Sequence, residues 1–114
     1  MTLLQLLLWM AVALAGAIAH EVAHHLVWLA TGRKPRFDVW GLQVVPTAGP
    51  PNGTLGDRVA GAAPYVCGLT ALVWAFVSGR VSWAIFGLAM VQLPSRADVA
   101  AMRGDVRWAS LVDQ

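Results

Sequence analysis

The sequence predicts an all-α membrane protein with three transmembrane helices and a small β-hairpin or strand between the first two. Two observations lead to this fold class. Hydrophobic residues make up 58% of the 114 residues and charged residues only 12%, whereas charged residues make up about 25% of an average soluble domain. Three candidate spans, most of whose residues are apolar, also recur at residues 3–30, 59–77 and 81–98. A chain of this length allows one small domain, so residues 1–114 are expected to form a single membrane-embedded domain.

The first segment, residues 3–30, contains no Lys, Arg or Pro. A helix rises about 1.5 Å per residue and the hydrocarbon layer is about 30 Å thick, so this segment can cross the bilayer and continue beyond it. A cleaved signal peptide over residues 1–19 is the alternative, because Ala-Ile-Ala at residues 17–19 fits a cleavage site. The apolar pattern continues to Ala30 and no basic residue precedes it, which favours a retained helix.

The stretch between the first and second segments predicts the β element. Residues 37–45 are rich in Val, Trp and Phe, and Pro46 follows them. Pro-Pro-Asn-Gly at residues 50–53 is a strong turn signal. We therefore expect a strand or short hairpin at the cytoplasmic membrane interface.

The second and third segments differ in how they end. The second, residues 59–77, is uncharged, and Asp57 precedes it as a predicted helix cap. The third begins at residue 81 and is apolar only as far as Leu93. Pro94 then removes a backbone donor and disfavours helix in the residue before it. We predict a helix that breaks inside the membrane, which is tolerated where it lines a protein cavity.

The basic residues set the predicted orientation, since short cytoplasmic loops are enriched in Lys and Arg. All of them but Arg80 follow the first or the third segment: Arg33, Lys34, Arg36, Arg58, Arg96, Arg103 and Arg107. We therefore expect a multi-pass protein of a prokaryotic cell membrane, with the N-terminus outside and the C-terminus in the cytoplasm. The net charge is only +2, and the basic residues fall in loops and not on one face, so no nucleic-acid partner is expected.

Every histidine and the only glutamate lie within the hexapeptide His20-Glu21-Val22-Ala23-His24-His25, inside the first apolar segment. Ionisable residues are expensive to place in a bilayer and mark functional sites there. Residues i and i+4 share a helix face, so His20 and His24 can bind one Zn²⁺. Glu21 lies beside that position, where it can act as general base on a bound water. His25 points away and is expected to be a polar residue near the cytoplasmic interface.

A catalytic zinc has three protein ligands and one open position for water, so another residue must complete the site. The remaining acids are Asp38, Asp57, Asp98, Asp105 and Asp113. Asp98 follows the broken helix, and Asp98 and His20 both lie roughly 25 Å from the outer ends of their segments if the chain stays helical. Asp98 is the predicted third ligand. Asp105, about 10 Å further along a helix, is the alternative.

His20-Glu21-Val22-Ala23-His24 in the first segment, and Leu-Pro-Ser-Arg-Ala-Asp at residues 93–98, resemble the motifs of the site-2 protease family of intramembrane zinc metalloproteases. Gly-Ala-Ala-Pro at residues 61–64 is similar to an element of that family's middle helix. The resemblance covers nearly the whole chain. It implies a three-helix core in which His20, His24 and Asp98 hold Zn²⁺ and Glu21 is the general base. The family's Asn before the Pro is absent, and Val99 replaces the Gly after the Asp.

The resemblance implies hydrolysis of peptide bonds in membrane-associated or transmembrane substrates. In such proteases an extended substrate can pair with an edge strand by main-chain hydrogen bonds, and the predicted hairpin offers such an edge. An ordinary surface hairpin is the alternative.

Two other functions stay open. One is a non-proteolytic membrane protein that binds metal or haem through His20, His24 and His25. The other is an inactive relative that binds transmembrane segments without cleaving them, which the missing Asp-Gly pair favours. The expected partners are the lipid bilayer and a membrane protein or peptide substrate. A homodimer or a partner subunit is left open, because small residues in the first and second segments can support close helix contacts.

Overall fold

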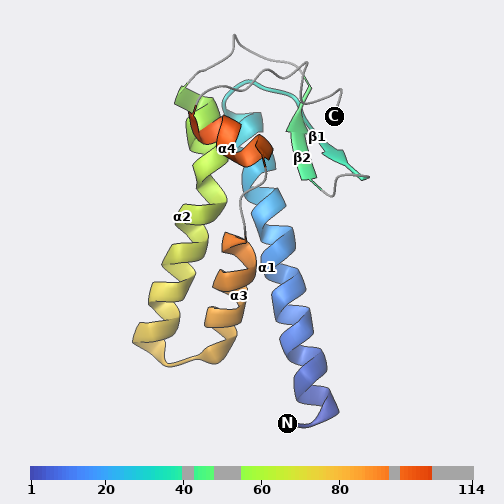
Figure 1. Cartoon of the computed structure of the whole chain (residues 1–114), viewed down its shortest axis with the longest axis vertical. Coiled ribbons are helices and arrows are strands. Elements are labelled where there is room, and N and C mark those ends of the chain that lie inside the picture. Colours follow the sequence, from blue (N-terminus) through green and yellow to red (C-terminus); the bar gives the residue numbers. More distant parts are fainter. Residues whose placement is uncertain (40–42, 48–54, 93–95, 104–114) are drawn as a thin grey trace. The chain divides into compact units, whose positions relative to one another are not determined.

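The computed structural model describes residues 1–39, 43–47, 55–92 and 96–103, and at residues 43, 96–98 and 100 the description covers the backbone only. Across these ranges the chain is mostly helical, with an antiparallel hairpin between the first two helices (Figure 1). The elements run in the order α1 (Leu3–Ala30), β1 (Pro35–Asp38), β2 (Gln43–Pro46), α2 (Leu55–Ser78), α3 (Val81–Val91) and α4 (Arg96–Arg103). The predicted helical class and the predicted hairpin are therefore confirmed.

Helix α1 begins with a capping box. The N–H of Gln5 donates to Oγ1 of Thr2 at 3.1 Å, and the N–H of Thr2 donates to Oε1 of Gln5 at 2.9 Å. This reciprocal pair satisfies backbone donors that have no partner inside the helix. The apolar run therefore has a defined start at residue 3.

Helix α1 ends in a Schellman motif. Gly32 has a φ of 91°, a left-handed conformation that glycine adopts without strain. The N–H of Gly32 donates to the carbonyl of Leu29 at 3.3 Å, and the N–H of Arg33 donates to that of Trp28 at 3.0 Å. The motif fixes where Arg33 leaves the helix and brings its guanidinium carbon to 5.6 Å from the centroid of the Trp28 ring.

The described chain divides into two compact units, and α1 and α2 each run through both of them. The first, here called the helical unit, comprises residues 1–20 and 64–92. The second, here called the hairpin unit, comprises the described parts of residues 21–63 and 93–114. The single domain expected from chain length stays a prediction.

In the helical unit, glycines let the helices approach closely. A Cβ atom built on Gly16 of α1 would lie 2.5 Å from the carbonyl oxygen of Phe86 in α3. One on Gly68 of α2 would lie 2.6 Å from Cγ2 of Val91, and one on Gly87 would lie 2.8 Å from the carbonyl oxygen of Gly68. Both α1 and α2 therefore pack against α3 through backbone surfaces that tolerate no side chain, which is typical of helix contacts in membranes.

Among the described helices, α1 and α2 are long and apolar enough to cross a membrane. Only 11% of the most apolar stretch of α1 and 33% of that of α2 is buried, so most of their apolar side chains face outward. The core helix of a soluble protein would instead bury these side chains.

The third apolar segment is shorter than predicted. Helix α3 covers 11 residues and ends at Val91. Gln92 follows with a φ of 43°, and its N–H donates to the carbonyl of Leu88 at 3.2 Å. Pro94 lies outside the described residues, and α4 begins at Arg96. Residues 81–98 are therefore not one helix, and the estimate that placed Asp98 at the depth of His20 does not apply, because it assumed a continuous helix.

The hairpin unit has its own small core. Strands β1 and β2 pair antiparallel, with Pro35 opposite Pro46 and Phe37 opposite Val44. The buried apolar cluster consists of Trp28, Val45, Ala60 and Ala101, from α1, β2, α2 and α4. The predicted turn at residues 50–53 lies outside the described residues. Helix α2 already begins at Leu55, so Asp57 lies in its first turn and not before it.

Candidate metal and catalytic site

His20 is held by the helical unit. Its side chain is only 1% exposed, and Nδ1 lies 2.6 Å from the carbonyl oxygen of Met90 in α3. Its ring also meets that of Tyr65 edge to face, with centroids 5.4 Å apart and planes at 89°. A carbonyl oxygen only accepts, so Nδ1 carries the proton and a neutral ring then has its lone pair on Nε2.

His24 is held in the same way by the hairpin unit. It is 3% exposed, and its Nδ1 donates to the carbonyl of Ala60 in α2 at 2.7 Å. The proton is again assigned to Nδ1, which leaves the lone pair of a neutral ring on Nε2. His20 and His24 are four residues apart on the continuous helix α1, so they lie on the same helix face.

Glu21 is tied to the hairpin. Its side chain is partly buried, and Oε2 accepts a hydrogen bond from the backbone N–H of Val44 at 2.7 Å. The N–H of Thr47 donates to the carbonyl of Lys34, and hydrogen-bonded pairs alternate along an antiparallel ladder. The pair Phe37–Val44 is therefore not hydrogen bonded, and the N–H of Val44 points away from β1. The outer edge of β2 thus presents a donor to the predicted general base.

The structure does not describe the side chain of the predicted third ligand, Asp98. The backbone of Asp98 lies in α4, but its side chain is outside the description, and Asp105 lies outside the described residues altogether. Among the side chains that the structure describes, no group of three metal-ligating residues comes together. His25 is half-buried, whereas its neighbour His24 is buried. The assignments of Asp98 as ligand and of His25 as a bystander stay predictions.

The hairpin unit also contains a buried ion pair that the sequence did not predict. Arg33 Nε lies 2.5 Å from Oδ1 of Asp57, and Arg33 Nη2 lies 2.7 Å from Oδ2, which is a bidentate arrangement. Both side chains are 1% exposed or less. Arg33 lies between α1 and β1, as predicted, but it is buried, whereas Lys34, Arg36 and Arg58 are exposed. The available signal was the Gly32-Arg33 helix ending, which directs Arg33 back over Trp28.

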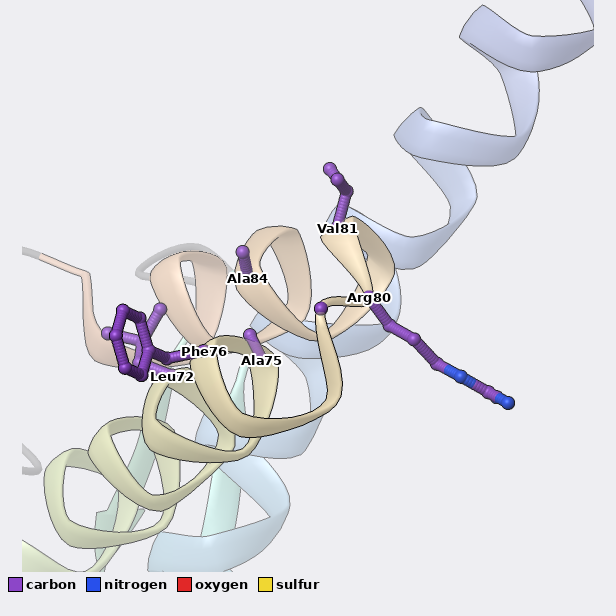
Figure 2. A pocket seen from close by; sticks show the side chains of 7 residues that line it. Leu72, Ala75, Phe76, Arg80, Val81 and Ala84 are labelled. Carbon is purple, nitrogen blue, oxygen red and sulfur yellow. The ribbon is translucent and has the colours of Figure 1, made fainter.

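Apolar hollows lie within the helical unit, and two of them have the larger volumes among those described. One is open and has a volume of about 420 Å³ around the α2–α3 turn, where Arg80 extends away from Leu72 and Phe76 (Figure 2). It contains none of the predicted site residues. The other has a volume of about 390 Å³ and includes Met90, whose carbonyl receives the His20 ring. Its lining residues are Ala19, Cys67, Thr70, Ala71, Trp74, Trp83, Phe86 and Met90.

Each of the two histidines has the hydrogen bond that is usual for a zinc-binding histidine. A histidine that binds a metal through one nitrogen almost always donates its other ring N–H to a carboxylate, carbonyl or water, which fixes the tautomer and the ring orientation. His20 and His24 both have this arrangement. Comparison of the chain with known protein families, with curated proteins and with solved structures gives no match.

Proposed function

We propose that this protein is an intramembrane zinc metalloprotease similar to the site-2 protease family. The observation that supports this most is the state of His20 and His24. Both are buried, they share a face of α1, and each donates Nδ1–H to a backbone carbonyl. Two oriented imidazoles one helical turn apart, beside a glutamate, form a zinc-protease motif.

The apolar surface supports the membrane assignment. Helices α1 and α2 are the proposed spans, and they are long and apolar enough to cross a bilayer. Helix α3, with its 11 residues, covers only about 17 Å, so we propose that it enters the membrane without crossing it as a straight helix. Exposed Lys34, Arg36 and Arg58 follow α1 or start α2, which supports a cytoplasmic hairpin and an outside N-terminus. The proposed location is a prokaryotic cell membrane.

The proposed reaction is hydrolysis of peptide bonds in membrane-associated or transmembrane substrates. His20, His24 and Asp98 would hold Zn²⁺, which when bound supplies a Lewis acid for the scissile carbonyl and for water. Glu21 would take the proton of the attacking water and deliver it to the leaving amine. Main-chain carbonyls of a spanning helix are hidden in hydrogen bonds, so the substrate must unwind locally to reach these residues.

The experiment that tests this proposal is metal analysis by mass spectrometry of the detergent-purified protein. We expect about one zinc per chain, lost in His24→Ala and Asp98→Ala and retained in the matched control His25→Ala. Zinc that survives Asp98→Ala would move the third ligand to Asp105 or to a partner subunit. Absence of zinc from the wild type, or iron with a haem spectrum, would overturn the proposal.

The role of Glu21 separates the protease from the non-proteolytic alternatives. The hydrogen bond from the Val44 N–H gives Glu21 a structural role that does not require catalysis. This observation favours, as the second candidate, an inactive zinc protein or transmembrane-segment binder. Glu21→Gln should retain zinc and lose about 1,000-fold in turnover of a membrane-spanning peptide if Glu21 is the general base. Wild-type turnover in that variant would contradict the mechanism. A protein that binds zinc but cleaves nothing would favour the second candidate.

A further inference from the structure

A proline in α2 removes a hydrogen bond at a specific carbonyl. In an α-helix the carbonyl of residue i accepts from the N–H of residue i+4. Pro64 lies inside α2, four residues after Ala60. Proline has no N–H, so the carbonyl of Ala60 cannot be satisfied from position 64.

The Ala60 carbonyl is the one that accepts the hydrogen bond from His24. Ala60 is 0% exposed and Pro64 is fully buried, so bulk water does not reach this turn of the helix. Buried carbonyls almost always have a hydrogen-bond partner. The Nδ1–H of His24 supplies it, at 2.7 Å. Since a carbonyl accepts only, this partner also requires the proton on Nδ1 and leaves Nε2 to act as a ligand.

The same spacing occurs at the other histidine. His20 donates to the carbonyl of Met90, which lies in the last turn of α3, and residue 94 is also a proline. Pro94 lies outside the described residues and α3 already ends at Val91, so at Met90 this spacing is a feature of the sequence only. Of six prolines in the chain, two stand four residues after the carbonyls that receive the two imidazoles.

We propose that Pro64 is a positioning residue for His24: it deprives the Ala60 carbonyl of its helical donor and so creates the acceptor that sets the tautomer and orientation of the ring. This inference rests on the proposed function, because it assigns the remaining ring nitrogen to zinc. It gives the proline of the Gly-Ala-Ala-Pro element a chemical role apart from bending the helix.

The test compares two replacements of Pro64 that differ in one group. Pro64→Ala restores an N–H, which competes with His24 for the Ala60 carbonyl. Replacement of Pro64 by lactic acid through suppressor-tRNA translation keeps the alanine methyl but has an ester oxygen in place of the N–H. We expect Pro64→Ala to weaken zinc binding about tenfold in a chelator competition, and the lactate variant to bind like the wild type.

A second readout does not need zinc. In metal-free protein, the ¹⁵N spectrum of His24 should show the Nδ1–H tautomer in the wild type and the lactate variant, and a mixture in Pro64→Ala. Equal zinc affinity and equal tautomer populations in both replacements would overturn the inference, as would equal losses in both. A wild type that binds no zinc but has the expected tautomer pattern would contradict the proposed function and leave the role of Pro64 standing.

Discussion

Each unit buries a histidine, His20 in the helical unit and His24 in the hairpin unit, but the units differ in their other close contacts. In the helical unit, the close contacts are made by Gly16, Gly68 and Gly87, and most apolar side chains of its helices face outward. In the hairpin unit, the buried groups include His24 and the ion pair of Arg33 with Asp57. Helices in lipid, which is the environment proposed for α1 and α2, gain little from apolar burial and depend on close packing, whereas buried polar groups depend on complete pairing. The two units should therefore fail under different substitutions.

The largest effect is expected from Arg33→Met, which leaves the buried Asp57 carboxylate without its guanidinium. Breaking a buried pair costs about 3 kcal/mol, because the remaining charge is uncompensated. Reversible unfolding in mixed micelles, followed by circular dichroism, would measure the loss. The double variant Arg33→Met/Asp57→Leu should recover most of it, and Arg36→Met, at an exposed position, should stay within about 0.5 kcal/mol. If Arg33→Met loses no more stability than Arg36→Met, the hairpin unit does not depend on the buried ion pair.

A smaller loss is expected from Gly16→Leu in the helical unit. A side chain at this position meets the carbonyl of Phe86, so α1 and α3 must separate, at about 2 kcal/mol. The same unfolding measurement applies. The matched control is Ala15→Leu, which adds the same side chain at the neighbouring, exposed position of α1 and should be nearly neutral. Equal effects at the two positions would contradict packing through Gly16.

Replacing the Val44 N–H by an ester oxygen should slow turnover without weakening zinc binding. Glu21 would lose the donor that orients it, and a tenfold fall in kcat corresponds to a hydrogen bond of about 1.4 kcal/mol. Steady-state kinetics and zinc content of the same sample would measure both quantities. An ester at Val45, whose N–H faces β1, is the control, and it should lower hairpin stability but not kcat. A fall in kcat in the control as well would indicate general damage to the hairpin.

The smallest effect is expected from Thr2→Ala at the exposed start of α1. It removes the capping box with Gln5 at a cost of about 1 kcal/mol. Hydrogen exchange should accelerate in the first turn only. Thr2→Ser keeps the hydroxyl and should exchange like the wild type. Faster exchange at His20 in Thr2→Ala would show that the helix end is coupled to the site.

The elements and the pair of histidines could be predicted because their signals are local. Apolar runs define α1 and α2, the Val-rich stretch defines β2, and the i, i+4 spacing places His20 and His24 on one face. Pro94 also gave the correct expectation that the third segment breaks. None of these inferences needs a contact between residues far apart in the sequence.

The partners of the site residues could not be predicted in this way. Nothing near His24 in the sequence indicates Ala60, and nothing near Glu21 indicates Val44, because these contacts depend on how α2 and β2 pack against α1. The burial of Arg33 could not be predicted for the same reason, because its partner carboxylate lies in a later helix. The third ligand stays undetermined by the described side chains.

The edge of β2 has one further consequence, which concerns self-association. Exposed strand edges with vacant N–H groups recruit strands from other chains and lead to aggregation. Over residues 43–46 the positions that face away from β1 are Val44, whose N–H is engaged by Glu21, and Pro46, which has none. An incoming strand therefore meets a carboxylate and a proline ring where it would need donors. The residue proposed for catalysis would thus also limit strand pairing at this edge, where Val44 is partly buried and Pro46 is buried.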